Sequence, residues 1–403
     1  MVIWYLCKYA SPEKYFFGTR HFYLGKEWVK QGHDVTIITS NSSHLTDKLP
    51  KFDGKFFEED IDGINTIWLN GLHVKKSSGA SRILSWMHFE WRLFFLPKKG
   101  FKKPDVIIAS SLSLLTVVNA YIFSKKYKAK FIFEVRDIWP LSAIELGNYS
   151  KYNPFIMLLS KIEKLGYKKA NAIVGTIPNL GARVEEVIGS GKNCYCIPQG
   201  ISMDFYSQSK SLDADYKEKY IPKNKFIIAY AGTLNANNPL ETFIEAAKLL
   251  QHHKEIHFLI VGKGDRKEHL VKLSQDIQNV SFIPAVNKNQ VNSLLHLVSI
   301  CYDSFSSELA RFGLSRNKWI DYMHAAKPII CSYSGFQSMI NEAKSGAFVE
   351  YGNAEALAEE ILKYSKMHQN QLKEIGENGK KFLIENRTFD RLAAKYIKII
   401  ERS

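Results

Sequence analysis

The sequence predicts an α/β protein built from two doubly wound domains. Apolar runs of strand length alternate with amphipathic segments of helix length, which is the pattern of repeated βα units. This pattern occurs twice, and between residues 201 and 224 it gives way to Ser, Asp, Lys and Tyr. A chain of 403 residues also exceeds what one compact core accommodates. We therefore place a first domain at 1–205 and a second at 206–385, and expect a C-terminal helix, about 386–403, to pack back on the first.

The first half opens with a βαβ unit. A strand at 2–6, a helix running to about Lys30 and ended by Gly32, and a strand at 34–39 predict a parallel sheet with a right-handed crossover. We expect further strands near 61–69, 105–109, 130–134 and 172–175. The ligand of such a domain lies at the carboxyl ends of its strands.

The second half repeats the arrangement. We expect strands at 226–231, 256–261, 280–283 and 298–302, a helix at 239–250, and helices from 353 onward. The first strand ends in Gly232-Thr233, and the second leads into Gly262 and, four residues on, Arg266. Two similar sheets in tandem predict an active site in a cleft between them.

The stretch 313–332 has the form loop, helix, strand, and it carries the chemistry we consider central. A helix opening at Ser315, with Asn317 and Lys318 in its first turn, directs backbone N–H groups and a cation at one point, as phosphate sites do. Lysine in a first turn opposes the helix dipole, so another reason must place it there. Asp321 follows one turn later, where its carboxylate can accept hydrogen bonds from sugar hydroxyls. An ordinary amphipathic helix is the alternative reading.

The chain is strongly basic, with 55 Lys and Arg against 40 Asp and Glu and a formal net charge of +15. Such an excess favours an anionic partner: nucleic acid, an acidic membrane or a phosphorylated ligand. No recognised nucleic-acid motif accompanies the charge, so we expect no nucleic acid among the partners.

The composition also indicates in which cell compartment the protein resides. The five cysteines are scattered, without a CxxC pair, and predict reduced thiols in a cytosolic protein with no structural zinc. The first nine residues are too short an apolar stretch for a signal peptide. The uncharged run 106–123 is long enough for a membrane span, but its serines, threonine and asparagine favour a buried strand followed by a helix.

A basic and aromatic segment lies at 75–103. Cations interleaved with large aromatic rings favour a helix lying on an anionic lipid surface. A core helix with basic flanks is the alternative. The candidate membrane contacts are Trp86, Trp91, Phe94, Phe95, Lys98, Lys99, Lys102 and Lys103.

A third polar segment follows the strand at 130–134. Arg136, Asp137 and Trp139 leave that strand and enter a loop, at the expected ligand end of the sheet. A simple surface ion pair between Arg136 and Asp137 is the alternative to a functional role.

In order and spacing, these stretches resemble the family-four retaining glycosyltransferases of GT-B fold, which use nucleotide sugars and no metal. The resemblance covers nearly the whole chain and rests on the following pieces: the loop with Gly18 and Arg20, Gly32-His33-Asp34-Val35, 172–176, 197–200, Gly232-Thr233, 262–265 and 321–328. The loop 137–140 and the run 315–318 look most like the branch that makes bacterial O-antigen and capsule, especially transferases of N-acetylfucosamine and related acetamido sugars.

The resemblance implies roles for the second domain. Gly232, Thr233 and Asn237 would approach the donor diphosphate, Gly262 and Arg266 the base or phosphate, and Asp321 the ribose. Lys318, with Ser315 and Asn317 beside it, would offset charge on the leaving nucleoside diphosphate. In the first domain Asp137 would be catalytic or touch the sugar. Gly18, Arg20, Arg136 and Trp139 would face the acceptor.

The chain departs from the family pattern at three places. No cation follows Gly232-Thr233, Gly313 stands where the first of two glutamates is usual, and Ala326 replaces the usual Gly before Lys-Pro. The diphosphate charge would then fall to the helix dipole, Lys318 and Arg266 or Lys263.

The sequence thus predicts a peripheral enzyme on the cytoplasmic face of the membrane. It would move an acetamido sugar from UDP to a polyprenyl-diphosphate-linked saccharide, without cofactor or metal. Because no nucleophile for a double displacement is evident, we expect a front-face mechanism in which the departing phosphate helps deprotonate the acceptor. The alternatives are a nucleotide-sugar 2-epimerase of the same architecture and a non-catalytic module that binds nucleotide sugars.

Overall fold

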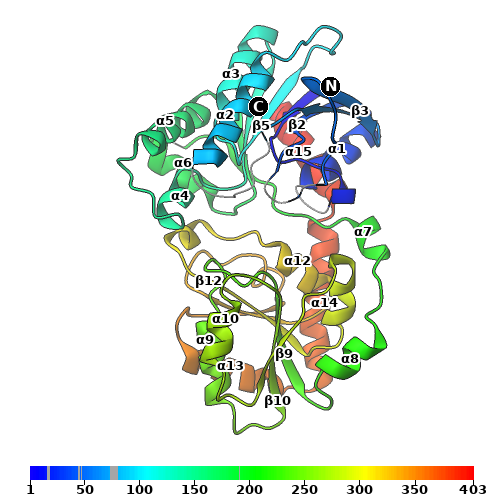
Figure 1. Ribbon diagram of the computed structural model, residues 1–403, viewed down its shortest axis with the longest axis vertical. Helices are drawn as coiled ribbons and strands as arrows, with labels where there is room; N and C mark the ends of the chain where they lie inside the picture. The colour runs from blue at the N-terminus through cyan, green and yellow to red at the C-terminus, as the bar shows by residue number, and fades with distance from the viewer. Residues whose placement is uncertain (16–18, 44–45, 47, 73–79, 190) are drawn as a thin grey trace. The chain divides into compact units, whose positions relative to one another are not determined.

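The chain divides into two compact units. Unit 1 comprises Met1–Pro198 and Phe389–Ser403, and unit 2 comprises Gln199–Thr388. The computed structural model describes residues 1–15, 19–43, 46, 48–72, 80–189 and 191–403 (Figure 1). The sequence-based boundaries stood at 205 and about 386.

Unit 1 is a sheet in the order β3-β4-β2-β1-β5-β6-β7-β8. Its strands are β1 (Val2–Leu6), β2 (Asp34–Ser40), β3 (Phe56–Ile61), β4 (Ile64–Leu69), β5 (Val106–Ser110), β6 (Lys130–Val135), β7 (Ala172–Gly175) and β8 (Cys194–Cys196). All neighbours pair in parallel except β3 and β4, which form an antiparallel hairpin. The strand order reverses beside β1, and at such a switch point open α/β sheets bind ligands.

The helices of unit 1 connect these strands, except for the C-terminal helix α15, which enters the unit after unit 2. They are α1 (Arg20–Lys30), α2 (Ala80–Phe94), α3 (Thr116–Tyr127), α4 (Leu141–Glu145), α5 (Pro154–Lys169), α6 (Leu180–Ile188) and α15 (Phe389–Arg402), with a short 3-10 turn, η1 (Glu13–Tyr15). The buried strand residues pack against the apolar faces of α1 and α15 in one continuous core.

The C-terminal helix α15 packs on unit 1 beside α1, as the red and blue helices in Figure 1 show. The indole of Trp28 lies edge-on to Tyr396, with ring centroids 5.3 Å apart, and donates to the carbonyl of Ala393 at 3.2 Å. The ammonium of Lys130 donates to the carbonyl of Ile400 at 2.7 Å, near the end of the helix. These contacts tie the last residues of the chain to its first domain.

Unit 2 is a wholly parallel sheet in the order β11-β10-β9-β12-β13-β14. Its strands are β9 (Phe226–Ala231), β10 (Ile256–Val261), β11 (Val280–Ile283), β12 (Ile300–Phe305), β13 (Ile329–Tyr333) and β14 (Gly346–Val349). This is the strand order of a dinucleotide-binding fold, with its switch point between β9 and β12.

The helices of unit 2 pack on both sides of this sheet (Figure 1). They are α7 (Met203–Ser207), α8 (Ala214–Tyr220), α9 (Glu241–Leu249), α10 (Lys267–Leu273), α11 (Val291–Leu295), α12 (Asn317–His324), α13 (Ala354–Ser365) and α14 (Gln369–Asn386), with 3-10 turns η2 (Lys288–Gln290) and η3 (Glu308–Phe312). The core is formed by inward residues of the strands, α9 and α13. Two doubly wound sheets confirm the predicted fold class.

Two local expectations need correction. The strand β3 was not predicted, because its sequence FFEEDI places acids on an exposed edge strand. The helix α12 begins at Asn317 rather than Ser315, since Arg316 is extended and Ser315 uses its hydroxyl to accept the backbone N–H of Gln199 at 2.9 Å.

All five cysteines are free thiols. No helix in the described part of the chain is both long enough and apolar enough to cross a membrane.

Candidate functional site

A pocket of about 530 Å³ lies at the carboxyl edge of the unit 2 sheet, which is a volume that accommodates a small organic ligand. Its wall comes from the ends of β9 and β10, the segment from β11 to α11, and the start of α12. The lining residues are Ala231, Gly232, Thr233, Asn238, Val261, Gly262, Lys263, Ala285, Val286, Lys288, Val291, Leu294, Arg316, Asn317, Lys318 and Asp321.

Two glycines allow the loops after β9 and β10 to approach each other. A Cβ atom built on Gly262 would lie 1.9 Å from the carbonyl oxygen of Gly232. A Cβ atom on Gly232 would lie 2.9 Å from the hydroxyl of Tyr230 and 3.3 Å from the ammonium of Lys318. Position 262 therefore requires glycine, and a side chain at position 232 would displace the Tyr230 hydroxyl. The resulting bare backbone borders the pocket.

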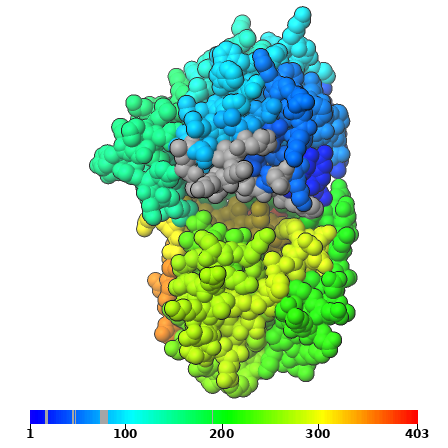
Figure 2. Space-filling view, viewed as in Figure 1, coloured from blue at the N-terminus to red at the C-terminus, as the bar shows by residue number. Residues whose placement is uncertain are grey.

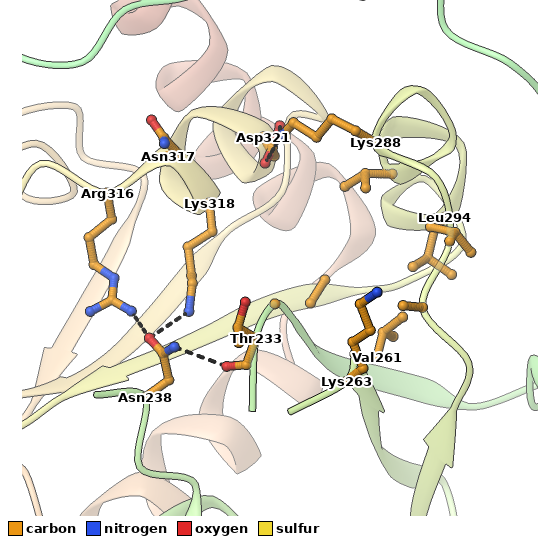
Figure 3. Close-up of a pocket in the computed structure, with 16 residues that line it drawn as sticks. Thr233, Asn238, Val261, Lys263, Lys288, Leu294, Arg316, Asn317, Lys318 and Asp321 are labelled. Carbon is orange, nitrogen blue, oxygen red and sulfur yellow. Dashed lines mark hydrogen bonds and ion pairs between the residues drawn. The ribbon is translucent and has the colours of Figure 1, made fainter. Parts of the chain in front are cut away.

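Two cations converge on the pocket from the start of α12. Figure 3 shows the side chains of Arg316 and Lys318 reaching toward the amide oxygen of Asn238, to which both donate. The buried carboxylate of Asp303, on β12, pairs with both: Arg316 Nε lies 2.8 Å from one oxygen and Lys318 Nζ lies 2.9 Å from the other. Anions are favoured in front of this helix N-terminus, where the cations also lie.

The charge state of Lys318 is finely balanced. Burial lowers the pKa of Lys318 to about 8, because it disfavours the charged ammonium, and the nearby Arg316 acts in the same direction. Asp303 opposes both effects. Lys318 is thus charged at neutral pH, but a modest change in its surroundings would alter its protonation.

Asp321 lies one turn further along α12 and faces the pocket. Lys288, from η2, contacts both of its carboxylate oxygens at 2.5 Å, and Tyr206, from α7, donates to it at 2.5 Å. Figure 3 shows Lys288 extending across the pocket wall to this carboxylate. A ligand hydroxyl at this position would meet an acceptor and a donor side by side.

Apart from Lys263, the remaining wall is mostly apolar. Val286, Val291 and Leu294 line the pocket in the region that follows β11. The pocket therefore has a cationic wall with exposed backbone, a carboxylate with an ammonium, and an apolar wall. A ligand that combines an anion, hydroxyl groups and a flat ring has matching chemistry.

The pocket gathers six of the predicted donor-site residues: Gly232, Thr233, Gly262, Asn317, Lys318 and Asp321. It does not include the other three. Arg266 pairs with Glu241 at 2.5 Å on the α9 side, Asn237 is replaced by its neighbour Asn238, and Ser315 holds Gln199. Their predicted roles in donor binding stay predictions.

Sequence reasoning missed Arg316, Asn238 and Lys288. Arg316 stands two residues before Lys318, so the convergence of two cations was visible in the sequence. No sequence signal marks Lys288, because its role depends on the folding of the segment after β11 against α12.

In unit 1, Arg20 has a structural role. Its guanidinium lies 3.3 Å from the buried carboxylate of Glu134 and donates to the carbonyls of Ile197 and Pro198. Burial opposes ionisation of Glu134, but Arg20, His21 and the Tyr5 hydroxyl outweigh it and hold the pKa of Glu134 below its ordinary value. The side chain of Arg20 is only 2% exposed, so the prediction that it contacts an acceptor is wrong.

The loop after β6 keeps its predicted residues together. Asp137 accepts hydrogen bonds from the hydroxyl of Ser142 and, at 3.2 Å, from the indole of Trp139. Arg136 and Asp137, both of which the structure describes, form no ion pair with each other. Both side chains are half-buried. Gly18, the other predicted acceptor residue, lies outside the described residues.

The helix α2 exposes one apolar stripe. Leu84, Met87, Trp91 and Phe95 follow helical spacing and are 57%, 55%, 55% and 65% exposed, and Phe94 beside them is 44% exposed. Trp86 is instead buried on the opposite side and donates to the hydroxyl of Tyr9, so its predicted membrane contact is wrong. Residues of this segment, light blue in Figure 2, lie at the surface of unit 1.

The lysines after α2 differ in their availability. Lys98 donates to three carbonyls at the end of α2, and burial lowers the pKa of Lys98 to about 8, so it serves the helix terminus. Lys102 pairs with Asp34 at 2.6 Å. Lys99 and Lys103 are exposed.

No group of three or more His, Cys, Asp or Glu side chains in the described ranges is arranged to hold a metal ion.

Residues 213–382, which include the whole pocket, match the family model of the group 1 glycosyl transferases. The chain is similar to a putative colanic acid biosynthesis glycosyl transferase, WcaI, of Escherichia coli K12, with 25% identity over 67% of this chain and 69% of that protein. It is also similar to an uncharacterized glycosyltransferase of Methanocaldococcus jannaschii, with 26% identity over 77% and 78% of the two chains. These matches confirm the prediction of an enzyme, a glycosyltransferase.

Solved structures share the fold over the full length. A sucrose-phosphate synthase of Thermosynechococcus elongatus superposes with a TM-score of 0.71 at 16% identity, covering 100% of this chain and 98% of that one. A trehalose-6-phosphate protein of E. coli bound with UDP-2-fluoro glucose gives 0.74 at 10% identity, covering 100% and 99%. HepE of Anabaena in complex with UDP and glucose gives 0.67 at 12%, covering 100% of both chains. At these identities the likeness concerns the fold, and it confirms the predicted GT-B class.

Proposed function

We propose that this glycosyltransferase moves an acetamido sugar from a UDP-sugar to a polyprenyl-diphosphate-linked saccharide, with retention of configuration, in capsule or O-antigen synthesis. The observation that carries the proposal is the three-part wall of the unit 2 pocket. Its apolar residues Val286, Val291 and Leu294 fit a base, Asp321 with Lys288 fits a ribose, and Arg316 with Lys318 fits a diphosphate. The likeness to structures that hold UDP or a UDP-sugar supports the nucleotide.

The chemistry follows from the charges. Cleavage of the bond between sugar and phosphate leaves negative charge on the nucleoside diphosphate, and the two cations at the start of α12 stabilise that charge where it develops. In the proposed front-face reaction the acceptor hydroxyl attacks the sugar carbon on the face from which the phosphate leaves, and its proton passes to that phosphate. Asp137 and Arg136, in the loop after β6, are the proposed sugar and acceptor contacts of unit 1.

The acceptor class is supported by two further observations. The relative WcaI is named for the biosynthesis of colanic acid. The apolar stripe of α2, with the exposed cations Lys99 and Lys103 beyond its end, has the composition of an interfacial helix on anionic lipid. An enzyme whose acceptor is anchored in a bilayer needs such a contact.

The donor is tested by thermal shift against a panel of UDP- and GDP-sugars, since a ligand that binds the folded state raises the apparent stability. We expect UDP-acetamido sugars to stabilise the protein most. Donors that bind are then incubated with a lipid-linked saccharide, with and without EDTA. Conversion of the UDP-sugar to its C2 epimer without acceptor would identify an epimerase, and activity lost to EDTA and restored by manganese would contradict the metal-free reaction.

The membrane contact is tested by flotation with vesicles containing anionic lipid. We expect the wild type to float and a Trp91→Ser/Phe95→Ser variant to stay in the soluble fraction, because it loses two exposed anchors of the α2 stripe. Tyr152→Ser is a matched control, since Tyr152 is an aromatic residue of unit 1 that is 75% exposed but lies outside the stripe. Equal flotation of all three proteins, or no flotation of the wild type, would contradict the membrane contact.

A further inference from the structure

The buried carboxylate of Asp303, in unit 2, contacts three side chains. It is fully buried on β12 and accepts from Arg316, Lys318 and the indole of Trp319, the last at 2.8 Å. It does not line the pocket itself, but both cations that it holds do.

Asp303 and two residues near the end of β9 hold the side chains of Arg316 and Lys318 in place. Asp303 takes Arg316 on one carboxylate oxygen and Lys318 on the other, and Trp319 donates to the oxygen that Arg316 also contacts. Asn238 and Tyr230 contact the cations from the β9 side, at 3.2 Å and 3.0 Å from the Lys318 ammonium. Lys318 therefore cannot leave the pocket wall without breaking three contacts.

We propose that Asp303 is a positioning residue of the donor site, which holds Arg316 and Lys318 toward the diphosphate and keeps Lys318 charged. The inference rests on the proposed function, because it assumes a diphosphate in this pocket. A buried carboxylate must be paired in any case, so a purely structural role is the competing explanation.

The two explanations differ in the pH dependence of binding. The titratable or charged groups that face Lys318 are Asp303 from β12, Arg316 from the turn before α12, Tyr230 from β9 and Cys331 from β13. Burial raises the pKa values of Tyr230 and Cys331 far above the neutral range, so both stay uncharged. Between pH 7 and 9 the protonation of Lys318 thus depends on burial, Arg316 and Asp303.

The pKa of Lys318 sets the direction in which pH changes the affinity for a diphosphate. The pKa of Lys318 is about 8, so the ammonium is present below that pH and is lost above it. Asp303 is the group that raises the pKa, and its removal must lower it. In an Asp303→Asn variant the affinity for a diphosphate would then begin to fall at a lower pH. Arg316 lowers the pKa of Lys318, so a variant without Arg316 would keep its affinity to a higher pH.

The experiment measures the dissociation constant of UDP from pH 6.5 to 9.5 by calorimetric titration, with uridine as a probe that lacks phosphates. Phosphate is fully ionised above about pH 7, so the protein dominates the profile. The wild type is expected to lose up to about tenfold in UDP affinity per pH unit above about pH 8, which corresponds to one proton. Asp303→Asn should move the onset lower by roughly one unit, and Arg316→Met should move it higher.

The control is Glu241→Gln, a carboxylate of the same unit that pairs with Arg266 outside the pocket and should leave the onset unchanged. If the wild type binds no UDP, the proposed function fails and the inference with it. If the wild type binds UDP but Asp303→Asn has the same onset, Asp303 is structural and only the inference fails. Should Asp303→Asn not fold, Asp303→Ser, which also removes the carboxylate, takes its place: a lower onset supports the positioning role, and an unchanged onset overturns it.

Discussion

At the scale of single residues, the proposed donor pocket takes its positive charge from the start of α12 and not from the loop after β9. No cation follows Gly232-Thr233, yet the backbone there faces Arg316 and Lys318 from the start of α12. A lysine in a first helical turn is unfavourable for the helix itself. Its contacts with Asp303 and Asn238 explain why it is there.

Lys318→Met tests this residue directly. It removes the ammonium but keeps an unbranched side chain, and we expect UDP affinity to fall about 10- to 100-fold at pH 7, since a hydrogen bond to a charged group contributes roughly 1.5–3 kcal/mol. Lys272→Met, an exposed lysine on α10 of the same unit, is the matched control. Equal affinity of the two variants, measured by calorimetry, would exclude Lys318 from the diphosphate site.

The sequence predicted part of this residue-scale picture. Lys318 and Asp321 were found because a helix start and its periodicity are local properties that a sequence displays. Arg20 was misassigned because a loop arginine near a strand end looks like a ligand contact, and only the fold brings Glu134 and the carbonyls after β8 around it. Lys288 was missed for the same reason.

At the scale of secondary structure, the end of α12 shows how one residue strains an element. Ala326, which follows the helix, adopts a left-handed backbone with φ of 52°. This region disfavours residues with a Cβ by about 1–2 kcal/mol, and a glycine is the common solution at a helix end. The chain therefore carries strain immediately before the strand β13.

We predict that Ala326→Gly stabilises the protein, by roughly 0.5–1 kcal/mol after the entropy of glycine is subtracted. Ala325→Gly is the comparison, because Ala325 has φ of −73° and glycine there relieves no strain. It adds flexibility, at a cost of about 0.5–1 kcal/mol, and also removes a buried methyl group. Urea unfolding monitored by tryptophan fluorescence compares the two. Destabilisation by both variants would mean that the left-handed residue is not strained.

Elements were predicted best where the pattern is strongly periodic and buried. Most parallel strands of both sheets are rich in buried apolar residues, and their order in the chain was predicted from the sequence, except for the short strands β8 and β14. The edge strand β3 was not, because half of FFEEDI is acidic and its pairing with β4 depends on the turn at Asp62-Gly63, where both residues have positive φ.

At the scale of the whole molecule, two units of similar architecture carry different chemistry. Unit 2 holds the cation-lined pocket, whereas unit 1 has the loop with Asp137 and the exposed apolar stripe of α2. The net charge of +15 suits an enzyme whose donor, acceptor and surface would all be anionic. The central claim is that the unit 2 pocket binds a nucleoside diphosphate in one orientation.

A crystal structure of the protein with UDP tests that claim most directly. We expect the uracil ring against Val286, Val291 and Leu294, the ribose hydroxyls at Asp321, and the β-phosphate within hydrogen-bond distance of Lys318 and the Gly232 backbone. UDP bound with its diphosphate at the apolar wall, or bound outside this pocket, would contradict it.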